Sequence, residues 1–185
     1  MENVKNYRAQ LKNQIKDACG KVIYTYTAHH KLADRLEKKI KYMCDAEIIL
    51  TALFFVATFV SFLTGNPSWA WLGLISVTLC LYLLNLYFKE YKIRDEVNQH
   101  RKAANTLWGI REEYVSLLVD FDTLEDSEIQ KKRDVLCNKV SEVNNHYPAT
   151  DKKSYKAAQK ALQKEEEQTF KENEVDSILP DRIDK

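Results

Sequence analysis

Two long apolar runs stand out from a chain in which polar and apolar positions otherwise recur at helical spacing. Between residues 48 and 88 there is no Asp, Glu, Lys, Arg or His, and the run is interrupted once, by turn-forming residues at 64–68. Its arms, residues 48–63 and 69–88, would be roughly 24 and 30 Å long as α-helices, close to the thickness of a bilayer's hydrocarbon core. The pattern predicts a two-helix transmembrane hairpin over residues 46–88. The alternative is a hairpin buried in the core of a soluble protein, but little of the chain remains to cover it on all sides.

Amphipathic stripes predict further helices on both sides of the hairpin. We expect the first helix to end at Gly20, which interrupts the first stripe. A second stripe leads into the first span without a helix breaker, so we expect one continuous rod there, and likewise a continuous helix from the second span to about residue 121. The first stripe is Val4, Tyr7, Leu11, Ile15 and Cys19, and the second is Ala28, Leu32, Leu36, Ile40 and Met43.

Two more helices are expected toward the end of the chain. Ser127 and Gln130 have the spacing of a capping box, and Thr150 can cap a last helix. The apolar face of the first is Ile129, Leu136, Val140 and Val143, and that of the second is Tyr155, Ala158, Leu162 and Phe170. We expect a loosely ordered polar tail at residues 171–185, in which Val175, Ile178 and Leu179 offer an alternative docking segment. The predicted fold is all-α, with cytoplasmic helices at residues 1–45 and 89–170 around the hairpin.

Charge placement predicts the orientation of the hairpin. Basic residues flank both of its ends and the turn carries no charge, so both termini are expected in the cytoplasm of a bacterium, with a multi-pass hairpin in the inner membrane. Trp69 and Trp71 are candidate anchors at the outer interface, and Lys89 at the inner one. A net charge of +1 and a mean hydropathy of -0.46 conceal the hairpin, because the charged segments outweigh it. The first residues are polar, so we expect no cleavable signal peptide.

Motifs for catalysis are absent from the sequence, which has four glycines and neither a phosphate-binding loop nor a nucleophile elbow. The cysteines Cys19, Cys44, Cys80 and Cys137 lack C-x-x-C spacing, so we expect free thiols. The histidines His29, His30, His100 and His146 lack the spacing of zinc ligands, and we expect them on helix surfaces. The sequence therefore predicts no enzyme, no metal, no cofactor and no direct nucleic-acid binding.

Each apolar arm carries a polar stripe at helical spacing. These candidate pore-lining or inter-helix residues are Thr51, Thr58 and Ser61 in the first arm and Thr78, Tyr82 and Asn85 in the second. Asn85 is the most informative of them, because an amide in hydrocarbon needs a polar partner. It either lines a pore or bonds within the hairpin near the inner interface, and both alternatives stay open.

Small residues provide candidate packing surfaces, either within one chain or between copies. These are Ala57, beside Ser61, in the first arm and Gly73, Ser76 and Cys80 in the second. Asp45 and Glu47 stand at the cytoplasmic end of the first arm, where a ring of copies would form an acidic collar that favours cations. We favour the simpler alternative, in which Glu47 pairs with Lys89 or Lys41.

The arrangement resembles the SLATT domain, a two-transmembrane effector associated with bacterial nucleotide-signalling and antiphage systems. The resemblance extends to about residue 161 and is carried by residues 104–114, by Leu117, Leu118 and Asp120, and by Pro148 and Tyr155. The chain is most similar to the subgroup found beside reverse transcriptases. The resemblance implies homo-oligomers that permeabilise the inner membrane and cause abortive infection, triggered by a separate sensor or reverse-transcriptase-type partner. The alternative is a non-conducting anchor or scaffold that tethers a partner enzyme to the lipid bilayer.

Overall fold

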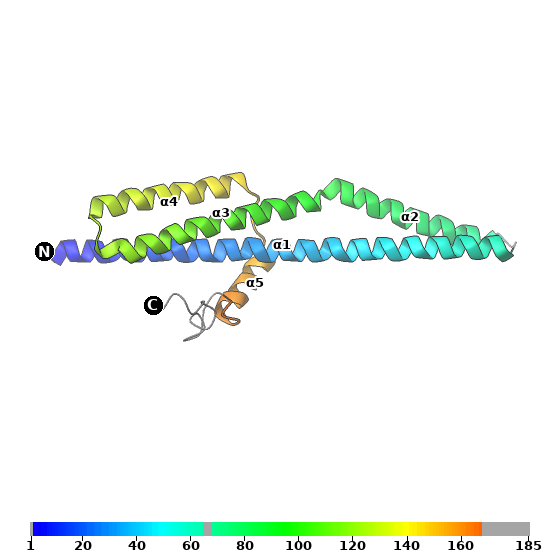
Figure 1. The fold of residues 1–185 in the computed structure, drawn as a ribbon, viewed down its shortest axis with the longest axis horizontal. Helices are drawn as coiled ribbons and strands as arrows, with labels where there is room; N and C mark the ends of the chain where they lie inside the picture. Colours follow the sequence, from blue (N-terminus) through cyan, green and yellow to red (C-terminus); the bar gives the residue numbers. More distant parts are fainter. Residues whose placement is uncertain (1, 65–67, 168–185) are drawn as a thin grey trace, which may run out of the picture.

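The computed structural model describes residues 2–64 and 68–167, and these residues form an all-α structure without strands. Helix α1 (Glu2–Thr64) runs the full length of the molecule, about 95 Å at the helical rise. Helices α2 (Ser68–Tyr91) and α3 (Ile93–Val119) follow one another antiparallel to α1, α2 along its second half and α3 along its first (Figure 1). The expected division at residues 45 and 46 therefore falls inside one unbroken helix.

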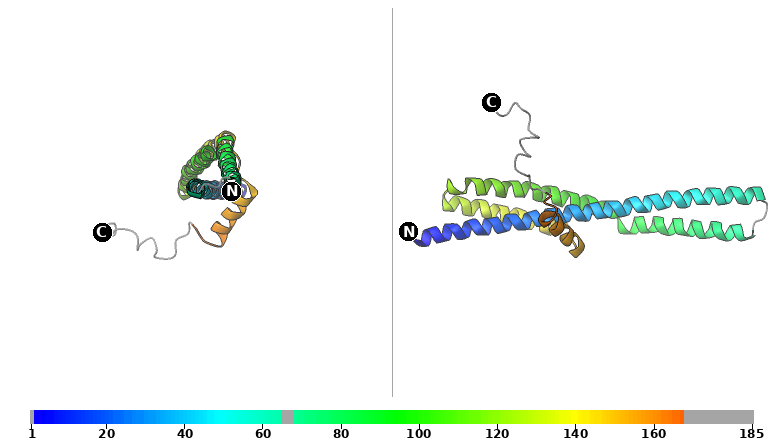
Figure 2. Two further views of the ribbon diagram at one scale, coloured as in Figure 1. Left: turned by 90° about the vertical axis from the view of Figure 1, so that its right-hand side faces the viewer. Right: turned by 90° about the horizontal axis from the view of Figure 1, so that it is seen from below.

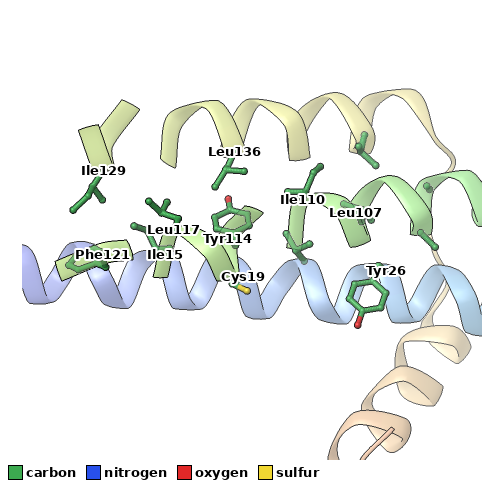
Figure 3. Close-up of a cluster of buried hydrophobic side chains, with 14 of the residues drawn as sticks. Ile15, Cys19, Tyr26, Leu107, Ile110, Tyr114, Leu117, Phe121, Ile129 and Leu136 are labelled. Atoms are coloured by element: carbon green, nitrogen blue, oxygen red, sulfur yellow. The ribbon is translucent and has the colours of Figure 1, made fainter. Parts of the chain in front are cut away.

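The first half of α1 forms a three-helix bundle with α3 and α4 (Asp126–His146), which a short 3-10 turn, Asp120–Asp122, connects to α3. Seen end-on, the helices form a triangle (Figure 2). Tyr114 lies inside it, between Cys19 of α1 and Leu136 of α4 (Figure 3). Helix α5 (Lys152–Gln163) crosses the middle of α1. Most core residues of α1 and α3 are three or four positions apart, and those of α4 are seven apart, so each helix buries one face, as the stripes in the sequence predict.

The expected helix end at Gly20 is wrong, because α1 continues through this residue. A glycine inside a helix costs about 1 kcal/mol relative to alanine. Cys19 and Val22, on either side, are buried in the bundle core, and their burial outweighs that cost. The predicted continuous rod from the second stripe into the first apolar arm is confirmed.

The expected continuity after the second apolar arm is also wrong. Lys92 separates α2 from α3 and has left-handed backbone angles, φ 39° and ψ 38°. This conformation costs a non-glycine residue about 1–2 kcal/mol. Directly beyond the break, Ile93 and Val97 are buried, so burial offsets the backbone cost. The helix then continues to Val119, close to the predicted end.

Both predicted helix caps are displaced by one or two residues. Glu125 occupies the cap position of α4, and Gln130 donates instead to the Tyr7 hydroxyl at 2.7 Å. Asp151, not Thr150, caps α5 by accepting from the Ser154 amide at 2.8 Å. The buried face of α5 is consequently Ser154, Ala158 and Ala161, whereas Tyr155 is exposed and Leu162 half-buried. The predicted face of α4 is confirmed, with Ile129, Leu136 and Val143 buried. Phe170 and the tail at 171–185 lie outside the described residues.

Candidate functional site: the apolar hairpin and its junction with the bundle

The hairpin, formed by residues 46–64 of α1 together with α2, has an apolar surface that no other described segment covers. By length and composition, the helix Asn6–Leu63 can cross a membrane, and no residue of its most apolar stretch is fully buried. The described part of α2 contains a shorter apolar helix, Trp71–Tyr87. Exposed apolar side chains on α1 include Ile48, Ile49, Leu53, Phe55, Val56, Phe59, Val60, Phe62 and Leu63, and on α2 Leu72, Ile75, Leu79, Leu83 and Leu86. So large an apolar surface indicates contact with a membrane or a partner rather than with water, and it argues against a buried soluble core.

Half-buried residues mark the faces that the two hairpin helices turn toward each other. On α1 they recur at three- and four-residue spacing and include Ala57 and Ser61. On α2 they are Leu74, Val77, Leu81, Leu84 and Tyr87. The predicted small-residue pair on α1 therefore packs within one chain. The other candidates, Gly73, Ser76 and Cys80, are exposed along one edge of α2.

The Ser and Thr hydroxyls of the two polar stripes are satisfied by their own helices. Thr51, Thr58, Ser61 and Thr78 each donate to the backbone carbonyl four residues earlier, at 2.7 to 2.8 Å. Ser76, outside the stripes, donates likewise to the Gly73 carbonyl at 2.8 Å. Such bonds allow Ser and Thr to sit in an apolar environment without water or a partner. These hydroxyls are therefore compatible with a lipid environment as well as with a pore.

Three of the predicted polar residues come together in one groove between the hairpin helices. Thr58 from α1 and Thr78 and Tyr82 from α2 line a groove of about 640 Å³. The remaining lining is apolar and consists of Phe54, Trp71, Leu74, Ile75 and Leu79. Thr51 and Ser61 are half-buried on α1 outside this groove. The side chains of the predicted anchors Trp69 and Lys89 lie outside the described part of the structure, whereas Trp71 is exposed at the groove.

At the other end of the hairpin, Asn85 meets Glu47. The Asn85 amide donates to the Leu81 carbonyl at 3.0 Å and lies 3.5 Å from the Glu47 carboxylate. Both side chains line a cavity of about 500 Å³ at the junction with α3, together with Cys44, Lys92, Ile93, Arg94 and Asp95. Asn85 therefore finds its partners within one chain. No ion pair between Glu47 and Lys41 forms among the described residues, and Asp45 is exposed away from the cavity.

A buried histidine pair joins α1 to α3 within the bundle. The Nδ1 atoms of His29 and His100 are 2.8 Å apart, and the side chains are 4% and 1% exposed. Burial, aided by the neighbouring imidazole, lowers the pKa of His29 from 6.5 to about 4, and burial also lowers the pKa of His100. Both rings are neutral at pH 7, one donating to the other. The expectation that these histidines lie on helix surfaces is wrong for this pair, because each fills an interhelical position; His146 is exposed as expected.

Arg101 forms a second link between α3 and α1, one residue further along. Its guanidinium donates to Asp34 at 2.6 Å and to Glu37 at 3.0 Å, and it contacts His30 at 3.1 Å. These hydrogen bonds raise the pKa of Arg101 above its ordinary value. The histidine pair and this ion-pair cluster hold α3 against α1 where the bundle meets the hairpin.

No cluster of three or more His, Cys, Asp or Glu side chains that could bind a metal ion occurs in the part of the chain that the structure describes. The cysteines are free: Cys19 is buried, Cys44 is half-buried, and Cys80 and Cys137 are exposed. Burial raises the pKa of the Cys19 thiol. A reactive thiol would need the opposite shift, so Cys19 is a packing residue of the core.

Comparison with known families identifies a match over most of the chain. A family model described as SMODS and SLOG-associating 2TM effector domain family 4, or SLATT_4, matches residues 11–174. No curated protein and no solved structure matches the chain. The family match and the uncovered apolar helix together indicate a membrane protein.

Proposed function

The chain belongs to the SMODS and SLOG-associating 2TM effector domain family, and we propose on that basis that it is a membrane effector of a bacterial antiphage defence system. In this proposal the hairpin spans the inner membrane twice, copies of the chain oligomerise, and the assembly permeabilises the membrane when a partner signals infection. Abortive infection follows. The observation that carries the proposal is the continuity of an uncovered apolar hairpin with a well-packed helical bundle through the single helix α1.

The proposed topology places both termini and the bundle in the cytoplasm. Basic residues on both sides of the hairpin support it, since short basic flanks are retained on that side. They include Lys38, Lys39 and Lys41 before the first arm and Lys92 and Arg94 after the second. Trp71, at the far end of α2, would then lie near the outer interface.

The trigger would act on the bundle and reach the hairpin through α1. The His29–His100 pair and the Arg101 cluster fix α3 on α1, so a partner that displaces α3 would also move α2 through the junction at Lys92. Such a movement would widen the groove at Thr58, Thr78 and Tyr82 toward the polar junction at Asn85. We place the trigger in a separate sensor or reverse-transcriptase-type partner. Neither catalysis nor direct nucleic-acid binding is part of the proposed activity.

Membrane potential tests this proposal. A voltage-sensitive dye would be read in bacteria after inducible expression of the wild type and of the double variant Asn85→Leu with Thr58→Val. We expect depolarisation by the wild type and its loss in the double variant, with equal amounts of both in the membrane fraction. Ser76→Ala is the matched control, because Ser76 also bonds to its own helix but lies outside the groove. An unchanged leak in the double variant would exclude these residues as the lining.

A non-conducting anchor is the second candidate function, and the self-satisfied hydroxyls of the hairpin favour it. A hairpin whose Ser and Thr groups need no water can remain inert in lipid. Replacing residues 46–88 with an unrelated two-span hairpin separates the two functions. An anchor would keep its protection against phage after this exchange, whereas a permeabilising effector would lose it.

A further inference from the structure

A second groove lies between α1 and α2 at the bundle end of the hairpin, and its lining has a basic part and an apolar part. Its volume is about 550 Å³. Arg35, Lys38 and Lys39 provide three cations on the side nearer the bundle, and Met43, Ala46 and Leu84 provide apolar surface on the side nearer the membrane arms. Leu36 and Tyr42 complete the lining, which contains no carboxylate.

The three cations differ in the partners that they already have within the chain. The Arg35 guanidinium binds the Asp151 carboxylate at 2.5 Å, and so belongs to the attachment of α5. The Lys39 ammonium contacts the Tyr87 hydroxyl and lies 4.9 Å from the centre of the Tyr87 ring. Lys38 is exposed and has no ion-pair partner among the described residues. Lys38 and Lys39 are therefore cations without carboxylate partners, and both face the same groove.

We propose that this groove binds an anionic phospholipid of the cytoplasmic leaflet. The phosphate would lie between Lys38 and Lys39, with the Tyr42 hydroxyl at headgroup level, and an acyl chain would follow Met43, Ala46 and Leu84 toward the bilayer. Basic pockets between membrane helices on the cytoplasmic side have this chemistry. A zwitterionic lipid is disfavoured because no carboxylate lines the groove to accept its ammonium group. This inference rests on the proposed hairpin topology.

The apolar half of the groove argues for a lipid rather than a free anion. Free phosphate would use the cations and leave Met43, Ala46 and Leu84 uncovered, whereas a lipid covers both halves. The groove also adjoins the exposed apolar surface of the hairpin, beginning at Ile48 and Ile49. An acyl chain leaving the groove would therefore stay in an apolar environment.

Native mass spectrometry of the full chain in detergent micelles tests this inference. Phosphatidylglycerol and phosphatidylcholine with the same acyl chains would be titrated onto the wild type, Lys38→Gln, and Lys38→Gln with Lys39→Gln. We expect the wild type to prefer phosphatidylglycerol. Since a cation near the surface contributes a factor of about five to anionic-lipid binding, the single variant should lose about fivefold and the double variant about 25-fold in affinity.

Lys41→Gln is the matched control, because Lys41 is an exposed cation of the same helix, close to Lys39 in the sequence, that does not line the groove. It should keep wild-type affinity for phosphatidylglycerol to within about twofold. An equal loss in Lys41→Gln would overturn the inference, as would equal affinity of the wild type for the two lipids. Displacement of bound phosphatidylglycerol by inorganic phosphate at equal concentration would also overturn it, because the site would then be one for free anions.

Protease protection of the same protein in phosphatidylglycerol vesicles separates this inference from the proposed function. A chain that inserts as a hairpin but shows no lipid preference refutes the groove alone and leaves the effector proposal standing. A chain that does not insert refutes both, since the groove then never meets a bilayer.

Discussion

The buried histidine pair makes the stability of the bundle depend on pH. The pKa of His29 lies near 6.5 in the unfolded chain and near 4 in the folded one. Between these values the unfolded chain binds a proton that the folded chain does not, so stability falls as the pH is lowered through this range. At about 1.36 kcal/mol for each pKa unit, His29 alone costs about 2 kcal/mol between pH 7 and pH 5, and about 3 kcal/mol in full.

Neighbouring groups change the size of the contribution of His100 to the pH dependence of stability, but not its sign. Burial lowers the pKa of His100, whereas the carboxylates of Glu96 and Asp151 raise it. Glu96 lies 3.9 Å from the Nε2 atom of His100, too far for a hydrogen bond. The burial effect dominates, so acidification destabilises this side of the pair as well. The double variant His29→Leu with His100→Leu should remove the share of the pH dependence that comes from this pair.

Tryptophan fluorescence during denaturant unfolding in detergent micelles measures this effect. Trp108 reports on the bundle, because its ring centre lies 5.4 Å from that of buried Tyr26. The variants Trp69→Phe and Trp71→Phe would remove the signal of the hairpin. At pH 7 the double leucine variant should stay within about 1 kcal/mol of the wild type, since both hydrogen-bond partners are removed together.

Between pH 7 and pH 5 the wild type should lose at least about 2 kcal/mol and the double leucine variant much less. His146→Gln, which changes an exposed histidine in the last turn of α4, should retain the full pH dependence. Equal pH dependence of the wild type and the double leucine variant would refute this reasoning.

Three further substitutions test the bundle and its helix breaks. Arg8→Ala removes charged hydrogen bonds to Asp126 at 2.5 Å and to the Phe121 carbonyl at 2.7 Å, and should cost about 2 kcal/mol in denaturant unfolding; a change below about 0.5 kcal/mol would contradict this. Gly20→Ala should stabilise the bundle by up to about 1 kcal/mol, seen as a higher melting temperature, because the added Cβ meets nothing within 4 Å. Lys92→Gly should also raise the melting temperature, by about 1 kcal/mol of stability, because it relieves the left-handed backbone; a lower melting temperature would count against strain at this position.

Periodicity along the chain predicted the elements whose stability comes from one apolar face. The rod through residues 28–63 and the face of α4 follow from three- and four-residue spacing, which depends on the helix alone. The two wrong expectations about helix continuity concern Gly20 and Lys92. At each, tertiary packing overrides the residue's own backbone preference. Packing of Cys19 and Val22 stabilises the helix across Gly20. Burial of Ile93 and Val97 stabilises the left-handed conformation of Lys92, which the local sequence does not predict.

Contacts between distant residues are the part of the site that the sequence could not reveal. His29 and His100 are 71 positions apart, and only the packing of α3 on α1 brings them together. The spacing of the polar residues showed the stripes. It did not show that the Thr58 and Thr78 hydroxyls bond to their own helices, or that Thr58, Thr78 and Tyr82 line one groove. The meeting of Asn85 with Glu47 follows from the antiparallel hairpin. The sequence did carry one signal for this contact, because an amide within an apolar segment needs a polar partner.

Thiol labelling in intact spheroplasts tests the membrane hairpin most directly. In a cysteine-free chain, one variant would carry a single cysteine through Asn66→Cys, between the two apolar arms, and the other would retain Cys137 alone, which is exposed on α4. With a membrane-impermeant maleimide, we expect the variant at position 66 to react in intact spheroplasts and the one with Cys137 to react only after permeabilisation. Protection of both positions until permeabilisation would contradict a hairpin that crosses the membrane twice.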